Sequence, residues 1–124
     1  MIQANECRIN NWVRYDNREF QIHAIAEEFP CLNTDEFGIG VVSWKSLEPI
    51  PLSPEILENC GFEKDRYGFN HRDEHLSFYY KHGIANGTYE PAWKETLIGT
   101  PIKYIHQLQN LYFSLCGEEL IFKP

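Results

Sequence analysis

The segment from Pro101 to Cys116, PIKYIHQLQNLYFSLC, constrains the fold more than any other stretch of the chain. Thr100 suits a helix N-cap, Pro101 suits the first helical position because it lacks an N–H, and Gly117 suits the left-handed residue that ends a helix. At about 100° per residue, the apolar side chains cover an arc of roughly 200°. The sequence therefore predicts one long helix over 101–116 that is buried on more than one side.

Two polar side chains, His106 and Gln109, lie within or at the edge of this apolar arc. A buried amide without partners costs about 1–3 kcal/mol, so we expect Gln109 to be hydrogen-bonded. His106 has no nucleophile at helical spacing beside it, which favours a packing histidine over a catalytic base. The two residues are predicted to form a structural polar network. Bonds from Gln109 to backbone groups of an adjoining sheet would indicate a scaffold.

The first part of the chain has the pattern of a small β unit. In NWVRY and REFQIHAIA apolar residues recur largely at every second position, and Asp16-Asn17 between them suits a tight hairpin turn. FPCLNTDEFG is interpreted as a polar, turn-rich loop, followed by two strand-like runs, GIGVVSW and SLEPI. These short strands predict a small SH3-like β-barrel or a strongly bent antiparallel sheet.

The proline-rich stretch PIPLSP marks a predicted boundary between two lobes, residues 1–52 and residues 53–124. After it, Ser53 is expected to cap a short helix that begins at Pro54. Strand-like runs, the long helix and a final short strand at 119–122 complete the second lobe. The resulting order, α-β-β-β-α-β, predicts an α+β fold in which a small antiparallel sheet carries the long helix.

The balance of charge excludes some classes of function. The net charge is −7, from 18 acidic and 11 basic residues. Because Lys and Arg neutralise phosphates in nucleic-acid complexes, this balance disfavours a general DNA or RNA binder. No run is long enough to span a membrane, and the start, MIQANECRIN, lacks the apolar core of a signal peptide. We therefore expect no membrane association and a cytoplasmic location.

The cysteines point to no metal or redox site. Cys7, Cys31, Cys60 and Cys116 are far apart and include no C-x-x-C pair, which argues against zinc-ribbon and thioredoxin-type sites. Free, mostly buried thiols are the preferred interpretation. No cofactor is expected.

Three segments together resemble a known family. YIHQLQNLYFSLCGEEL, from Tyr104 to Leu120, is similar to a C-terminal signature that runs Tyr-Val-His-Gln-Leu-Gln-Asn-Leu-Tyr-Phe-Ala-Leu-Thr-Gly-Glu-Glu-Leu, with departures at Ile105, Ser114 and Cys116. RINNWV is similar to that family's Arg-Ile-Gly-Asn-x-Val opening, and LEPIPLSPEILENCGFEK is similar to its Pro-Ile-Pro-Leu-helix-Gly-Phe link. The family comprises small proteins of Bacteroides-type gut bacteria and their phages and has no assigned function. The resemblance therefore implies a link to mobile elements and supplies no catalytic residues.

The segment HRDEH holds the residues most suited to binding a metal. On a strand, His71, Asp73 and His75 would share one face, and His82 follows, so a divalent metal could find two or three ligands. The charged residues around the segment are typical of a solvated hairpin tip, which is the preferred interpretation, and the H-E-x-x-H motif of zincins is absent. A metal-dependent hydrolase built on these four residues is kept as an alternative.

The leading hypothesis is a non-catalytic interaction or accessory module. Two small lobes with 15% aromatic residues carry no coherent active-site constellation, so the expected partner is a protein or a second copy of the chain. A second alternative is nucleic-acid binding through the N-terminal barrel. Its local basic and aromatic patch would consist of Arg8, Trp12, Arg14 and Arg18.

Overall fold

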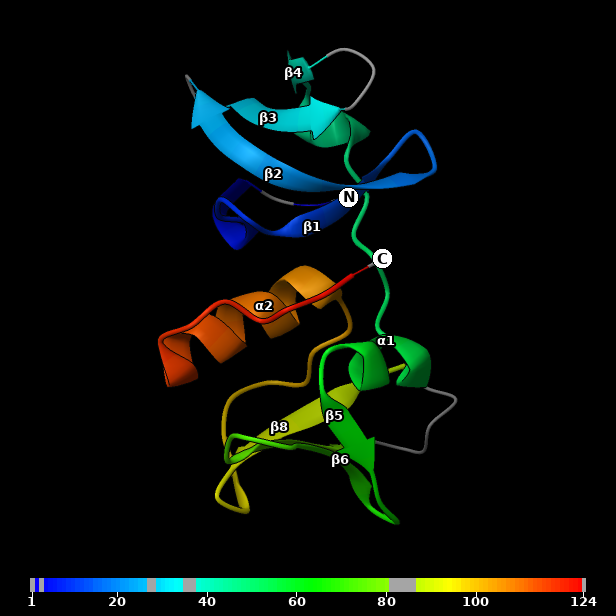
Figure 1. Cartoon of the computed structure of the whole chain (residues 1–124), viewed down its shortest axis with the longest axis vertical. Coiled ribbons are helices and arrows are strands. Elements are labelled where there is room, and N and C mark those ends of the chain that lie inside the picture. The colour runs from blue at the N-terminus through cyan, green and yellow to red at the C-terminus, as the bar shows by residue number, and fades with distance from the viewer. Residues whose placement is uncertain (1, 3, 27–28, 35–37, 81–86, 124) are drawn as a thin grey trace. The chain divides into compact units, whose positions relative to one another are not determined.

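The structure, a computed structural model, describes residues 2, 4–26, 29–34, 38–80 and 87–123. The chain contains two antiparallel sheets, one of four strands in the order β1-β2-β3-β4 and one of five strands in the order β5-β6-β7-β8-β9 (Figure 1). Together with the helices, they confirm the predicted α+β class. No helix among the described residues is long and apolar enough to cross a membrane.

The chain divides into two compact units. Unit 1 contains Met1–Ile50 and Tyr104–Asn110, and unit 2 contains Pro51–Lys103 and Leu111–Pro124. The chain passes from one to the other near the predicted boundary at Leu52. The elements of unit 1 are η1 (Ala4–Glu6), β1 (Trp12–Tyr15), β2 (Arg18–Ala26), β3 (Phe29–Thr34), β4 (Gly38–Val41) and η2 (Trp44–Ser46). Unit 2 holds α1 (Pro54–Asn59), β5 (Phe62–Lys64), β6 (Gly68–His71), β7 (Leu76–Tyr80), β8 (Tyr89–Trp93) and β9 (Thr96–Leu97), and α2 (Ile105–Cys116) has residues in both units.

The first two strands form the predicted hairpin. Tyr15 lies opposite Arg18, and the two residues between them, Asp16 and Asn17, have φ angles of 51° and 61°. Both central residues of a type I′ turn need positive φ, and Asn and Asp tolerate it better than other residues with side chains. Side chains along the two strands point alternately to opposite faces of the hairpin, and one of these faces is buried. The core of unit 1 contains Ile2, Val13, Phe20, Ile22, Leu32 and Leu47.

The third strand corrects the predicted loop. Phe29–Thr34 pairs with β2 on one side and β4 on the other, and Pro30 lies opposite Ile25. The carbonyl of Pro30 accepts a hydrogen bond of 3.0 Å from the Val42 N–H. Proline and polar residues weaken the strand pattern of this segment, and its pairing with β2 and β4 holds it extended.

The sheet of unit 1 is bent and does not close into a barrel over the described residues. β1 and β4 are its two edges. A register shift between Ile22 and Ala24 interrupts the β2–β3 ladder, and such irregularities bend a strand. The predicted strand in SLEPI contributes a single bridge, Glu48 opposite Arg14. The bent-sheet alternative is therefore the right one, and the SH3-like barrel is wrong.

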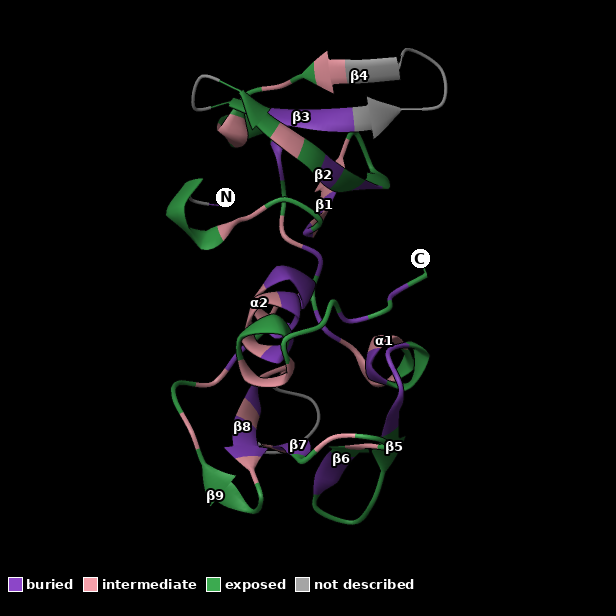
Figure 2. Cartoon of the chain, turned by 60° about the vertical axis from the view of Figure 1, so that its left-hand side comes forward, coloured by how far each residue is buried: buried purple, intermediate pink, exposed green. Residues whose placement is uncertain are grey.

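Unit 2 begins with the predicted short helix. The Ser53 hydroxyl accepts a hydrogen bond of 3.2 Å from the Ile56 N–H, Pro54 is the first helical residue, and Gly61 has a φ of +95°. The sheet that follows has five strands, where the sequence predicted three before the long helix. The additional strands are short, and both residues of β9 are exposed (Figure 2).

The long helix begins four residues later than predicted. Ile102 and Tyr89 exchange two backbone hydrogen bonds of 2.8 and 2.9 Å, so the chain is still extended after Pro101. The Gln107 side chain then accepts a hydrogen bond of 3.1 Å from the Tyr104 N–H, which is half of a capping box. At the other end, Gly117 has a φ of +73°, and its N–H donates to the Phe113 carbonyl, as predicted for the end of the helix.

The predicted final strand at 119–122 is wrong. Leu120 and Phe122 are buried, but the described residues after Gly117 form no strand. One side chain bonds to the backbone of this segment. The Asn59 amide donates to the Lys123 carbonyl at 2.7 Å and accepts from the Lys123 N–H at 3.1 Å.

Candidate functional site

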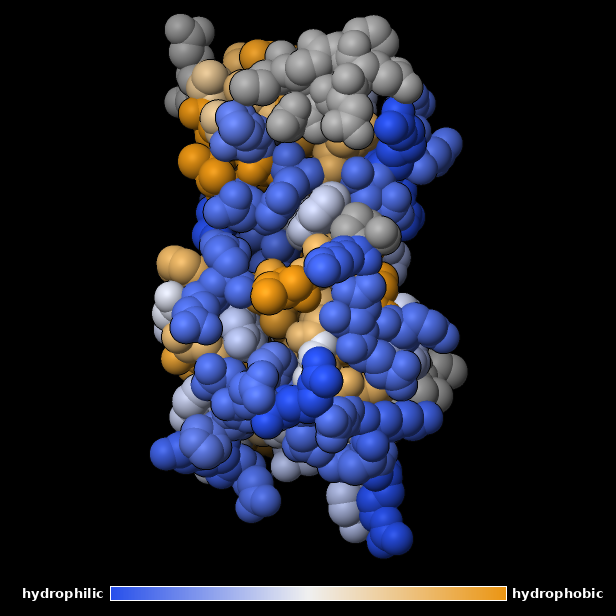
Figure 3. All heavy atoms as spheres, in the orientation of Figure 1, coloured by the Kyte–Doolittle hydropathy of each residue, from blue (hydrophilic) through white to orange (hydrophobic). Residues whose placement is uncertain are grey.

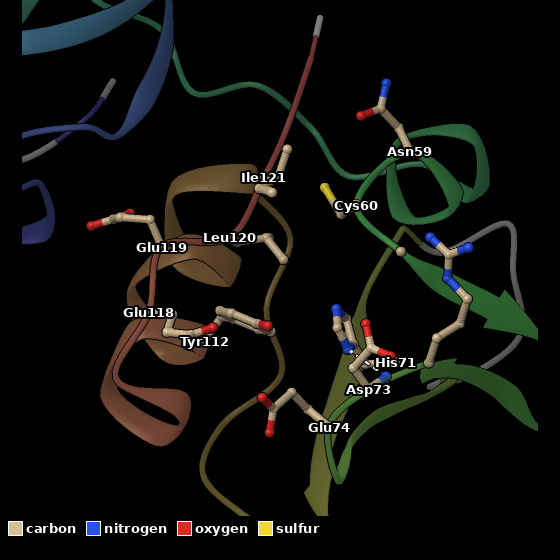
Figure 4. A pocket seen from close by; sticks show the side chains of 12 residues that line it. Asn59, Cys60, His71, Asp73, Glu74, Tyr112, Glu118, Glu119, Leu120 and Ile121 are labelled. Carbon is tan, nitrogen blue, oxygen red and sulfur yellow. Dashed lines mark hydrogen bonds between the residues drawn. The ribbon is translucent and has the colours of Figure 1, made fainter.

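An acid-lined cavity of about 330 Å³ lies in unit 2 (Figure 4). Its walls come from four segments: the end of α1, the tip of the β6–β7 hairpin, helix α2 and the C-terminal segment. Four carboxylates and one guanidinium line it, together with polar and apolar groups. The lining residues are Asn59, Cys60, Gly61, His71, Arg72, Asp73, Glu74, Tyr112, Glu118, Glu119, Leu120 and Ile121.

His71, the last residue of β6, is held in one orientation. Its ring meets the Phe62 ring edge-on with centroids 5.0 Å apart, and it lies 5.2 Å from the Tyr112 ring. The Asp73 N–H donates to His71 Nδ1 at 3.2 Å, so the neutral imidazole carries its proton on Nε2. Gly61 makes room for the ring, because a Cβ at this position would lie 3.2 Å from His71 Nε2.

Burial lowers the pKa of His71 and outweighs the negative charges of Asp73 and Glu74, which act in the opposite direction. The ring is therefore neutral at pH 7. It acts in the cavity as a hydrogen-bond donor and as part of an aromatic wall, without adding positive charge.

Tyr112 places a hydroxyl group in the cavity. The residue is only 6% exposed, and Figure 4 shows its hydroxyl pointing towards the hairpin tip. Within the described part of the chain this hydroxyl has no hydrogen-bond partner, so it is left for water or a ligand. Burial, assisted by negative charges that include Glu74 and Glu118, raises the pKa of Tyr112 to about 12. The phenol is therefore protonated at neutral pH.

Two thiols in this part of unit 2 also have raised pKa values. Burial raises the pKa of Cys60, which lines the cavity, to about 12. Burial also raises the pKa of Cys116 to about 11, assisted by the charge of Glu74 and a hydrogen bond with it. Burial is the main cause for both sulfur atoms and for Tyr112, and the charges of Glu74 and Glu118 add to it at Cys116 and Tyr112.

The structure separates the residues of the predicted metal site. His71 and Asp73 line the cavity, whereas the His75 ring packs edge-on against Trp93, with centroids 5.6 Å apart. His75 lines a different cavity of about 420 Å³, and His82 lies outside the described residues. Among the residues that the structure does describe, no three His, Cys, Asp or Glu side chains are grouped to hold a metal ion.

Gln109 bonds to the backbone at the start of β1. Its Oε1 accepts from the Trp12 N–H at 2.7 Å, and its Nε2 donates to the Asn10 carbonyl at 3.0 Å. His106, also buried, lies 3.2 Å from a Glu6 carboxylate oxygen through Nε2. Both polar side chains thus hold the segment before β1, which is a structural role.

The arginines of the predicted basic patch make contacts within unit 1. Arg8 donates to the Gln109 carbonyl at 3.2 Å, Arg14 lies 3.4 Å from a Glu19 carboxylate oxygen, and the Arg18 guanidinium lies 5.3 Å from the centre of the Phe20 ring. Trp12 is half-buried. Each of the three arginines thus has a contact of its own within unit 1.

Most of the cavity was not predicted from the sequence. Tyr112 lies on a helix that the sequence predicts to be buried on more than one side, and Glu118 and Glu119 belong to no predicted site. The acidic residues of HRDEH were a partial signal, but no spacing rule joins segments so far apart. No family model, curated protein or solved structure matches the chain. The resemblance to the Bacteroides and phage family therefore stays a prediction.

Proposed function

We propose that this chain is a non-catalytic interaction module that binds a positively charged side chain of a protein partner in the cavity of unit 2. One observation carries the proposal: four carboxylates line a cavity into which Tyr112, a residue that is 6% exposed, points a hydroxyl that has no hydrogen-bond partner in the described chain. Arg72 offsets one of these charges. A cation entering the cavity would meet acceptor oxygens on several sides.

The electrostatics favour a cation because four carboxylates line the cavity and only one guanidinium, that of Arg72, stands against them. Asp73 and Glu118 are exposed and Glu74 is half-buried, so Glu74 is the least screened of the three. Exposed ion pairs contribute only about 0.2–1 kcal/mol each. Specificity would come from the hydrogen bond to Tyr112 and from Glu74, where water is partly excluded.

The protonation states support binding over catalysis. A thiol or phenol attacks as its anion, and the pKa values of Cys60 and Tyr112, each raised to about 12, leave both groups protonated at neutral pH. His71 uses its Nδ1 lone pair to accept from the Asp73 N–H. Its Nε2 therefore carries a proton and is not available as a general base.

Titration with n-butylamine, which is a cation at pH 7 and mimics a lysine side chain, tests the proposal. We expect chemical-shift changes at Tyr112, Glu74 and Glu118 in NMR spectra of the full chain, and none of this size with neutral n-butanol. Glu74→Gln should weaken binding by about fivefold, the loss of one partly buried ion pair. Glu63→Gln, a change of an exposed carboxylate outside the cavity, should leave binding unchanged. Equal shifts with the amine and the alcohol would overturn the proposal.

A further inference from the structure

We infer that the partner presents its positively charged residue next to an aliphatic residue, and that this aliphatic side chain packs on Ile121. The inference rests on the proposed function and names the kind of segment that the same site recognises. Ile121 lines the cavity and is 71% exposed. It is therefore an apolar side chain at the edge of an acid-lined recess.

The exposure of Ile121 follows from its place between two buried residues of the C-terminal segment. Burial alternates along the segment, so successive side chains there lie on opposite sides. Leu120 and Phe122, on either side of Ile121, are buried. The two hydrogen bonds between the Asn59 amide and the Lys123 backbone hold the segment beyond Phe122. An anchor that is already ordered costs little conformational entropy when a partner covers it.

The surroundings of Ile121 indicate the chemistry of the partner. Glu118 and Glu119 precede it in the chain and line the same cavity. On the face shown in Figure 3, hydrophobic side chains along the C-terminal segment are bordered by hydrophilic ones. A side chain that covers Ile121 therefore has carboxylates as neighbours, and a basic residue beside it in the partner would complement the charge of Glu118.

The matching partner is a short extended segment with a Lys next to Leu, Ile or Val. The lysine would enter the cavity towards Tyr112 and Glu74, and its aliphatic neighbour would cover Ile121. A second copy of this chain fits less well, because it would bring another net charge of −7 towards the same carboxylates.

Three capped dipeptides test the inference on the full chain by NMR titration: acetyl-Leu-Lys-amide, acetyl-Gly-Lys-amide and acetyl-Leu-Gln-amide. We expect the Leu-Lys peptide to bind about fivefold more tightly than Gly-Lys, as partial burial of one leucine side chain would produce. Leu-Gln, without the charge, should be the weakest ligand. Ile121→Ser should remove the difference between Leu-Lys and Gly-Lys and leave Gly-Lys binding as it was.

Ile25→Ser is the matched control, because Ile25 is a 40% exposed isoleucine of unit 1 that does not line the cavity. It should preserve the fivefold preference. Equal affinities of Leu-Lys and Gly-Lys, or an unchanged preference in Ile121→Ser, would overturn the inference and leave the proposed function standing. If no lysine peptide and no butylamine binds the folded chain, both fail together. Circular dichroism of each variant establishes that it is folded.

Discussion

The backbone N–H of Trp12 donates a hydrogen bond of 2.7 Å to the side-chain Oε1 of Gln109. The same amide donates from Nε2 to the Asn10 carbonyl at 3.0 Å. One side chain thus satisfies a donor and an acceptor on two residues of the same segment, as a peptide group of an adjacent strand would. Asn59 makes the same kind of paired contact with Lys123 in unit 2.

Gln109→Leu should destabilise the chain by about 2–3 kcal/mol, because it leaves the Trp12 N–H and the Asn10 carbonyl without this partner. Urea denaturation measures the loss. The control is Gln21→Leu, which removes an amide that donates to the same Asn10 carbonyl but is exposed. Water can replace that bond, so its cost should be below about 1 kcal/mol. Similar losses for both variants would contradict the structural role of Gln109.

Asn59→Ala should loosen the C-terminal segment. Both bonds to Lys123 are exposed, so the expected loss is about 1 kcal/mol of local stability. Hydrogen exchange of the Lys123 N–H should become faster, while exchange in the β7–β8 ladder stays the same. Unchanged exchange at Lys123 would show that the amide does not hold the segment.

Gly61→Ala should cost more stability than Gly99→Ala. Both glycines have positive φ, +95° and +74°, so both substitutions strain the backbone. At Gly99 an added Cβ meets nothing within 4 Å, whereas at Gly61 it lies 3.2 Å from His71 Nε2. We expect about 1 kcal/mol at Gly99 and about 2 kcal/mol at Gly61 by urea denaturation. A shift in the His71 ring resonances in Gly61→Ala alone would identify the contact.

Acidification should destabilise the chain through His71 and His106. Burial lowers the pKa of each below the usual value of 6.5. The unfolded chain therefore binds protons at a pH where the folded chain does not. Their contribution to stability is present above pH 6.5 and is lost as the pH falls towards each folded pKa.

NMR titration of the histidine side chains measures these pKa values directly. His71→Gln should reduce the fall in unfolding free energy between pH 7.5 and pH 5.5. A His71 pKa at or above 6.5 would contradict the prediction.

Local chemistry made part of the fold predictable. Asp16 and Asn17 define their turn by their own tolerance of positive φ, and Ser53 with Pro54 defines the start of α1 within one helical turn. The start of α2 was misplaced because Thr100 and Pro101 carry a valid helix signal, which the pairing of Ile102 with Tyr89 overrides. The strand at Phe29–Thr34 was missed for a related reason, since it depends on two neighbouring strands.

The sequence by itself determined the α+β class, the first hairpin, the short helix, the end of the long helix and the need of Gln109 for partners. Each depends on groups within a few residues of one another or on the period of the apolar pattern. Tertiary structure alone decided where Gln109 finds those partners, that the C-terminal segment is held by Asn59, and that Tyr112 faces carboxylates from two other segments. Such relationships join residues that are distant in the sequence, and spacing carries no information about them.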